Sequence, residues 1–147
     1  MIHPMRLYED TDVRGIYAAC HPGWPARAPR WFEAHPTLVL EVERAIVGYT
    51  SYSIGLPPGP NPTEFEIQWG HGVYVRPDAR GRGYGRHLCD ARLAVARALG
   101  LRTFFGMTQP DNHAMIHLFE QDGLKCYGEA PNAYPDGSAG VFYFGRV

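Results

Sequence analysis

The chain reads Val-Tyr-Val at residues 73–75 and Arg-Gly-Arg-Gly-Tyr-Gly at residues 80–85. This order predicts a strand, a turn at residues 76–78, a glycine-rich loop and then a helix over residues 84–99. Glycines have no Cβ, so their backbone N–H groups can converge on an anion. The N-terminus of the following helix adds partial positive charge at the same place. The stretch therefore predicts a loop that cradles a pyrophosphate, built on Gly81, Gly83 and Gly85.

Outward from this loop, hydrophobic periodicity and turn residues predict alternating elements along the whole chain. A short strand is expected at residues 5–8, and helices at 10–20 and 27–34. A hairpin at 37–54 turns at Glu43-Arg44, and a long strand covers 64–75. After the helix at 84–99, whose apolar stripe is Leu88, Ala91, Val95 and Leu99, come a strand at 102–107, a helix at 112–121 and two strands in 124–147. A hairpin-rich front followed by one crossover predicts a mixed sheet covered by helices.

Length and composition describe an ordinary globular chain. With 147 residues, 45% hydrophobic and 20% charged, it is expected to form a single domain over residues 1–147. A net charge of −1 gives no overall field that would attract nucleic acid or a membrane surface. The three cysteines include no CxxC pair, which argues against a zinc site or a disulfide framework and favours a reducing cytoplasm, with the thiols buried as small hydrophobic groups. The N-terminal residues carry no apolar core of a secretory signal, and no apolar run reaches membrane-spanning length.

The pattern Arg-x-x-Gly-x-Gly at Arg80, Gly83 and Gly85 resembles the coenzyme A loop of the GCN5-related N-acetyltransferase (GNAT) family. The expected element order, β-α-α-β-β-β-α-β-α-β-β, is also the order of that family. Asn112 and the pair 123–124 are similar to two further landmarks. The resemblance implies an α/β (α+β) fold, in which a mixed, largely antiparallel sheet of six to seven strands is flanked by about four helices.

The resemblance also implies acetyl-CoA as co-substrate, with no metal. It places the pyrophosphate at the glycine loop and its arginines, and the acyl carbonyl and pantetheine at backbone N–H groups of the strand before the loop. The open alternatives are a plain turn with a solvated basic face, or a loop for another nucleotide, although no Gly-Lys-Ser/Thr of a Walker A loop follows. The implied coenzyme contacts are Val73, Tyr74, Val75, Arg80, Gly81, Arg82, Gly83, Tyr84, Gly85, Arg86, Asn112 and Phe119.

His71 and Glu66 are the candidate catalytic bases. An acceptor amine arrives as ammonium and must lose a proton, and imidazole titrates near neutral pH. Counting by two, His71 shares a strand face with Val73 if no bulge intervenes. In the resembling family, either a histidine or a water-linked glutamate of this strand serves as base. A histidine packed in the sheet and a solvated glutamate remain the structural alternatives.

Phe119 departs from the family pattern, in which a tyrosine often protonates the departing thiolate. Phenylalanine has no proton to give. Tyr127, Tyr74 or Tyr143 could serve instead, or no acid is needed, since a thiol pKa of about 8.5 makes the thiolate a good leaving group. The departure also leaves open a non-catalytic module.

The function predicted by the resemblance is transfer of an acetyl group from acetyl-CoA to a primary amine by direct attack in a ternary complex. A small-molecule amine is the expected acceptor, held near Trp24, Trp31, Tyr52, Trp69 and the proline-rich loop 55–63. The alternatives are a peptide or protein acetyltransferase, acting on lysine or an N-terminus, and a non-catalytic acyl-CoA-binding module. A cytoplasmic location and no nucleic-acid or membrane partner are expected, and the family pattern also allows a homodimer.

Overall fold

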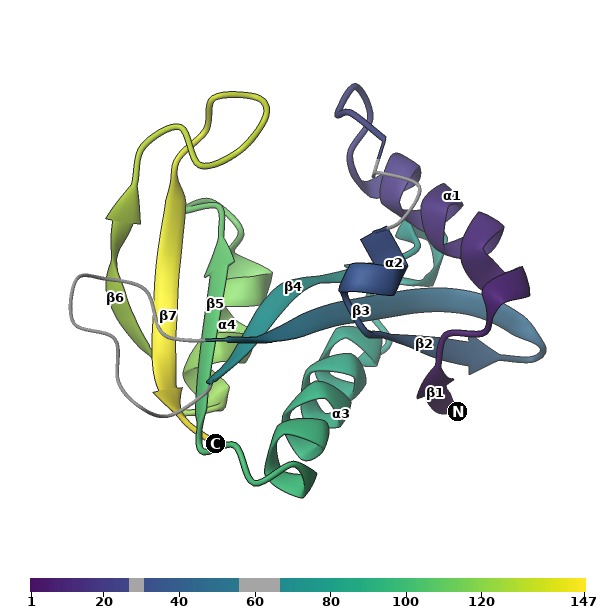
Figure 1. Ribbon diagram of the computed structural model, residues 1–147. Helices are drawn as coiled ribbons and strands as arrows, with labels where there is room; N and C mark the ends of the chain where they lie inside the picture. Colours follow the sequence, from purple (N-terminus) through teal and green to yellow (C-terminus); the bar gives the residue numbers. More distant parts are fainter. Residues whose placement is uncertain (27–30, 56–66) are drawn as a thin grey trace. The chain divides into compact units, whose positions relative to one another are not determined.

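The computed structural model describes residues 1–26, 31–55 and 67–147, without the side chains of residues 31, 32, 67–69 and 71. The expected element order is confirmed, with two short 3-10 helices added (Figure 1). The strands are β1 (Ile2–Pro4), β2 (Thr37–Val42), β3 (Ala45–Gly55), β4 (Ile67–Val75), β5 (Thr103–Thr108), β6 (Lys125–Ala130) and β7 (Gly140–Arg146). The helices are η1 (Leu7–Glu9), α1 (Asp10–Cys20), α2 (Trp31–Ala34), η2 (Pro77–Ala79), α3 (Tyr84–Ala98) and α4 (His113–Gln121).

The described residues form two compact units, each made of separate stretches of chain. The first contains residues 1–52 and 73–92, and the second contains residues 53–72 and 93–147. The strands are hydrogen-bonded in the order β1-β2-β3-β4-β5-β7-β6. Strands β4 and β5 pair in parallel. The chain passes from the second unit to the first within β4, between Gly72 and Val73. This mixed α/β architecture confirms the expected fold class.

In the first unit, helices pack on the β2–β3 hairpin through two apolar clusters. Val13 and Ile16 of α1 join the register partners Val39 and Tyr49 in one cluster. The other cluster joins Leu40 and Val47 of the hairpin to Ala79 and to Leu88 of α3. The hairpin turn lies at Glu43 and Arg44, with φ of 50° and 65°, as expected from the sequence. Both helices are thus fixed to the same hairpin, which sets the frame for the residues after β4.

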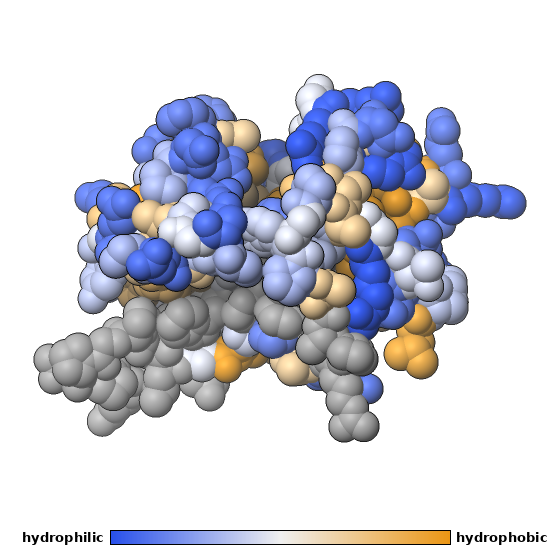
Figure 2. All heavy atoms as spheres, turned by 90° about the horizontal axis from the view of Figure 1, so that it is seen from above, coloured by the Kyte–Doolittle hydropathy of each residue, from blue (hydrophilic) through white to orange (hydrophobic). Residues whose placement is uncertain are grey.

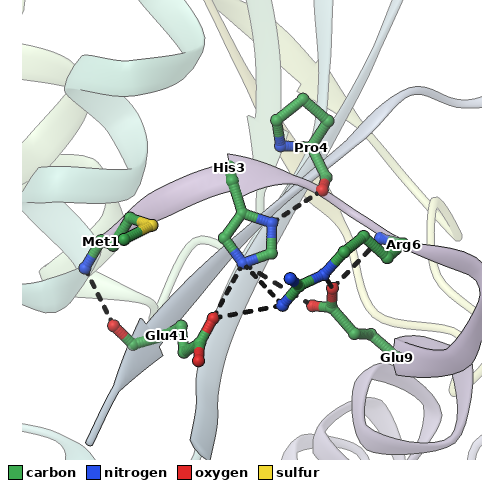
Figure 3. Close-up of polar contacts among 6 residues, drawn as sticks. All are labelled: Met1, His3, Pro4, Arg6, Glu9 and Glu41. Atoms are coloured by element: carbon green, nitrogen blue, oxygen red, sulfur yellow. Dashed lines mark hydrogen bonds and ion pairs between the residues drawn. The ribbon is translucent and has the colours of Figure 1, made fainter. Parts of the chain in front are cut away.

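A polar network holds the start of the chain against β2 (Figure 3). Arg6 binds the carboxylate of Glu9, whose side chain is only 2% exposed, and its Nη2 lies 3.3 Å from Oε2 of Glu41. His3 Nε2 lies 3.1 Å from the same Glu41 oxygen. Because a buried carboxylate is costly without a partner, the Arg6 contact is what allows Glu9 to be enclosed.

The prediction of a strand at residues 5–8 is wrong in position. The first strand is β1 at residues 2–4, in which Ile2 pairs with Leu40. The next residues turn into η1, since the N–H of Glu9 donates to the carbonyl of Arg6 at 2.9 Å. The polar contacts of Arg6 and Glu9 therefore favour a 3-10 turn at residues 7–9, although the alternation of apolar residues there is typical of a strand.

The second unit has aromatic rings on both faces of its sheet. On one face, Phe119 of α4 lies 5.1 Å from Tyr143 of β7 and 6.3 Å from Phe104 of β5, between ring centroids. Gly106 permits this approach, because a Cβ there would lie 2.8 Å from Cζ of Phe119. Another ring group joins Phe105 to Phe142, Phe144 and Tyr127.

Helix α3 differs from the expected apolar stripe. Leu99 lies beyond the helix end and is 56% exposed, so it is not part of the core. The buried positions include Leu88, Leu93 and Ala96, together with Arg92, which is 2% exposed and donates to Oγ1 of Thr50 at 3.0 Å. Apolar periodicity does not predict the burial of Arg92, because arginine is a charged residue.

The remaining surface is mixed in character. The face drawn in Figure 2 carries mainly hydrophilic residues with small hydrophobic spots among them. Of the cysteines, Cys89 is buried, Cys20 is half-buried and Cys126 is exposed, so the expectation of three buried thiols is wrong for Cys126. Within the described ranges, none of the helices is long and apolar enough to cross a membrane.

Candidate coenzyme site

The loop before α3 has the backbone geometry that an anion cradle needs. Gly81 and Gly83 have φ of 78° and 80°, a region that favours glycine. A Cβ built on either would meet no atom within 4 Å, so open space lies beside both. The helix ladder starts where the N–H of His87 donates to the carbonyl of Gly83, and the first turn of α3 holds no acidic side chain. Its first N–H groups are left without helical acceptors, which suits a negatively charged ligand.

The arginines around the loop have different partners. Arg76 pairs with Asp78, and Arg86 pairs with Asp90 at 2.8 Å. Arg80 donates to the carbonyl of Val75 at 3.1 Å and to Sγ of Cys20 at 3.2 Å. These contacts tie the start of the loop to the end of β4 and to α1.

Arg82 differs from these three arginines. Its side chain is exposed, and it makes no ion pair with any residue that the structure describes. Its charge is therefore available to a ligand at the glycine loop. Arg80 is also exposed and, among the described residues, binds a carbonyl and a thiol rather than a carboxylate.

The end of β4 is held against β3 by a close backbone approach. Gly48 of β3 allows this approach, because a Cβ there would lie 2.8 Å from the carbonyl oxygen of Tyr74. The N–H of Arg76 donates to the carbonyl of Val47 at 2.8 Å. Val73, Tyr74 and Val75 are thereby fixed next to the glycine loop, within the same unit.

The candidate bases are placed less completely. His71 lies in β4, but its side chain is not described, and Glu66 lies outside the described residues. Gly72 has φ of 97°, so the backbone between His71 and Val73 leaves the extended conformation. Regular alternation cannot be counted across Gly72, and the expectation that His71 and Val73 share a face loses its support.

Asn112 and Phe119 lie in the second unit. Asn112 caps α4, its Oδ1 accepting from the N–H of Met115 at 3.2 Å. Phe119 is 3% exposed and stacks on Tyr143, whose pKa is raised by burial and by the charges of Glu120 and Cys126. Of the three tyrosines considered as acids, Tyr143 is the one in contact with Phe119, while Tyr127 is 67% exposed.

The sequence did not predict that the C-terminal end of α1 contacts the end of β4 and the start of the glycine loop. Cys20 contacts Val75 and Arg80, and the ring of His21 meets the Tyr74 ring edge-on at 5.1 Å. A signal was present: Arg14, Tyr17, Ala18 and His21 have the spacing of one helical face. These residues line a pocket together with Trp24, one of the expected acceptor-side residues. The side chains of Trp31 and Trp69 and residues 56–63 of the proline-rich loop lie outside the described part of the chain.

Comparison with known proteins agrees with this geometry. The Acetyltransferase (GNAT) family matches residues 6–124. The chain is 34% identical over 115 residues to an L-methionine sulfoximine/L-methionine sulfone acetyltransferase of Pseudomonas paraeruginosa, covering 72% of this chain and 63% of that protein. It is 30% identical over 106 residues to the L-amino acid N-acyltransferase MnaT of Escherichia coli, covering 69% of this chain and 59% of that protein. The matched region thus spans about three fifths of the length of these curated relatives.

A solved structure gives the same result for the fold. The structure of yncA from Salmonella typhimurium with its cofactor acetyl-CoA superposes with a TM-score of 0.78 at 22% identity, covering 99% of this chain and 92% of that chain.

Proposed function

Because the chain belongs to the acetyltransferase (GNAT) family, we propose that it transfers an acetyl group from acetyl-CoA to the primary amine of a small molecule. The observation that carries the proposal is the loop at Gly81 and Gly83, with its left-handed backbone, open space and acid-free helix start. The bound coenzyme supplies the acetyl group as a thioester. Support for a small amine acceptor comes from the relatives, which are named for amino acids and amino-acid analogues.

The pyrophosphate contacts follow from the loop. Backbone N–H groups of residues 81–86 face the anion, and Tyr84, Gly85 and Arg86 supply the first turn of α3. Arg82 pairs with the phosphate oxygens, which guanidinium binds well. Arg80 serves as a positioning residue, because its guanidinium already binds Val75 and Cys20. The family resemblance assigns Asn112 to the pantetheine side of the coenzyme and Phe119 to packing against the coenzyme.

The strand end contributes fixed backbone donors. An N–H of Val73 or Tyr74 hydrogen-bonds the acyl oxygen, which gains negative charge as the amine attacks. The approach of β3 at Gly48 holds this backbone in place before reaction, so the donor needs little reorganisation.

Proton transfer completes the reaction. One proton of the ammonium passes to His71 or, through water, to Glu66, and the neutral amine nitrogen then bonds to the carbonyl carbon. The C–S bond breaks, and the nitrogen gives its second proton to solvent, which leaves a neutral amide. The leaving thiolate takes a proton from Tyr143 or from water. Burial raises the pKa of Tyr143, so its phenol is protonated at neutral pH but gives up its proton less readily than an exposed tyrosine does.

Turnover on an amine panel tests the proposal. The panel holds L-methionine sulfone, its primary amide, putrescine and a lysine peptide, and thiol release is measured together with the N-acetylated product. We expect one thiol per acetylated amine and sequential kinetics, because no acyl-enzyme forms. Binding of acetyl-CoA without product from any of these amines would instead indicate a non-catalytic module.

A further inference from the structure

Helix α4 carries two histidines, His113 and His117, that lie four positions apart. Residues at this spacing lie above one another on a helix, with Cβ atoms about 5–6 Å apart. Both histidines are exposed, whereas Met115 and Phe119, on the other side of the helix, are buried. The two imidazoles are therefore neighbours at the surface, outside the packing of the helix.

The rings of these two histidines have no partner among the residues that the structure describes. Neither imidazole makes a hydrogen bond, an ion pair or a ring contact there. His21, by contrast, stacks on Trp24 with ring centroids 4.1 Å apart. The ring nitrogens of His113 and His117 are thus available to a ligand, and the exposed side chains can turn toward one ion without disturbing the core.

The stretch of chain around the histidine pair is acidic. Residues 103–124 include Asp111, Glu120 and Asp122 but no lysine or arginine. Glu120 is exposed and lies three positions after His117, on the same side of α4. These negative charges attract a cation and counteract the partial positive charge at the N-terminus of the helix. The charges of this segment therefore favour a cation over an anion as the ligand of the two rings.

Two imidazoles also select the kind of cation. Imidazole nitrogen is a good ligand for Zn²⁺, Ni²⁺ and Cu²⁺, whereas Mg²⁺ and Ca²⁺ prefer oxygen. Two histidines four apart on one helix face are a known arrangement of zinc ligands. Within the described ranges, no group of three or more histidines, cysteines or carboxylates is placed to hold an ion. An ion on α4 would therefore have two protein ligands and water at its other positions, which suits a weak and exchangeable site.

We propose that His113 and His117 form a surface site for a divalent transition-metal ion of the zinc, nickel and copper class. The two neutral imidazoles bind the ion through nitrogen, and no bond of the chain is made or broken. Because the ion joins two residues one turn apart, it stabilises the helical form of the first turn of α4. The site shares no residue with the glycine loop and supplies no step of the acetyl transfer, so the proposal does not depend on the transferase function.

Calorimetric titration with Zn²⁺ tests the pair directly. The parent protein for this experiment carries Cys126→Ser, because an exposed thiol is a competing zinc ligand. We expect the parent to bind Zn²⁺, and His113→Gln and His117→Gln each to weaken the binding about tenfold or more, because either change leaves a single imidazole. Equal affinity in the parent and both variants, or no binding to the parent at millimolar Zn²⁺, would overturn the proposal.

A matched control changes the spacing and keeps the number of histidines. The double substitution His117→Gln with Ala114→His moves the second ring to the residue next to His113, and Ala114 is exposed like the histidines. Adjacent residues of a helix point in different directions, so the two rings no longer face one ion. This variant should bind Zn²⁺ as weakly as His117→Gln alone. If it binds as tightly as the parent, the spacing of the two rings does not matter and the proposal is wrong.

Two further measurements locate the ion and detect a folding defect. Of the seven histidines, His113 and His117 are the ones whose imidazole NMR signals should shift with Zn²⁺. Without zinc, all variants should unfold at nearly the temperature of the parent, because the substituted residues are exposed. With zinc, the parent should unfold at a higher temperature and the variants should gain less. Zinc-induced shifts confined to other histidines would place the ion elsewhere and contradict the assignment.

Discussion

Gly83 lies between Arg80, whose backbone is extended, and the first residue of α3, Tyr84. The chain changes direction there through the left-handed backbone of Gly83, with φ of 80°. Any residue with a Cβ is strained in this conformation, by roughly 1 kcal/mol. Strain alone would lower the free energy of unfolding without a functional meaning. A control glycine with the same backbone and no ligand is therefore needed, and Gly100 provides it, with φ of 77° and open space around it.

Gly83→Ala should lose acetyl-CoA affinity, whereas Gly100→Ala should not. Both variants are expected to unfold at similarly lowered temperatures, since the added strain is the same. The Cβ at residue 83 projects into the space assigned to the pyrophosphate and should raise the dissociation constant by about tenfold or more. Calorimetry with acetyl-CoA and thermal unfolding separate the two effects, and equal affinity in both variants would contradict the assigned cradle.

Arg82 and Arg80 should respond differently to the same substitution. Arg82→Gln is expected to weaken acetyl-CoA binding by about tenfold to a hundredfold with little change in stability, because its exposed charge meets the phosphate. Arg80→Gln removes contacts to Val75 and Cys20, so it should also lower the unfolding temperature. Salt titration of the affinity provides a second readout, which Arg82→Gln should flatten.

Asp136 gives a pH prediction in the β6–β7 connection. Hydrogen bonds from Ser138 and Gln109 hold its pKa below 3.8. A lowered pKa stabilises the fold above pH 3.8, and this contribution disappears as pH falls through the folded value. Ser138→Ala should raise the pKa of Asp136 toward 3.8, as measured by NMR titration of its carboxyl carbon. An unchanged pKa would show that the hydrogen bond from the Ser138 hydroxyl is not its cause.

At the scale of elements, the glycine loop and helices α1, α3 and α4 were predicted well because their signals are local. Of the helix expected at residues 27–34, only α2 lies in the described part of the chain. Glycine spacing, caps and apolar periodicity are all read within about twenty residues of chain. Short elements and buried polar groups were predicted poorly. β1 has three residues and is placed by its pairing with β2, while Arg6 and Glu9 hold the turn that follows it. In α3, Arg92 is buried because it meets Thr50, a residue from another element.

Packing between β5 and α4 gives the prediction at this scale. Gly106→Ala places a methyl group 2.8 Å from the ring of Phe119 and should destabilise the protein by about 1–3 kcal/mol. Gly128→Ala in β6 is the matched control, because a Cβ there meets nothing within 4 Å. Denaturant unfolding compares the two, and a neutral Gly106→Ala would mean that the β5–α4 contact is loose.

Considered as a whole molecule, the chain builds its candidate site from distant stretches of sequence. Arg80 reaches Cys20 across 60 positions, and His21 contacts Tyr74. No local pattern announces such contacts, so the glycine loop was predicted from sequence while the aromatic pocket was not. His71 and Glu66 stay predictions, as do the single domain and the homodimer.

Acetyl-CoA binding is the claim on which the other assignments depend, and thermal unfolding tests it most directly. At a ligand concentration of about a hundred times the dissociation constant, binding adds about 2.7 kcal/mol, a rise of roughly 5–10 °C for a chain of this size. S-acetyl-N-acetylcysteamine, which carries the thioester without the pyrophosphate, should give a much smaller rise. We expect the large shift with acetyl-CoA, reduced in Gly83→Ala, whereas no shift at millimolar acetyl-CoA would contradict the proposed coenzyme site.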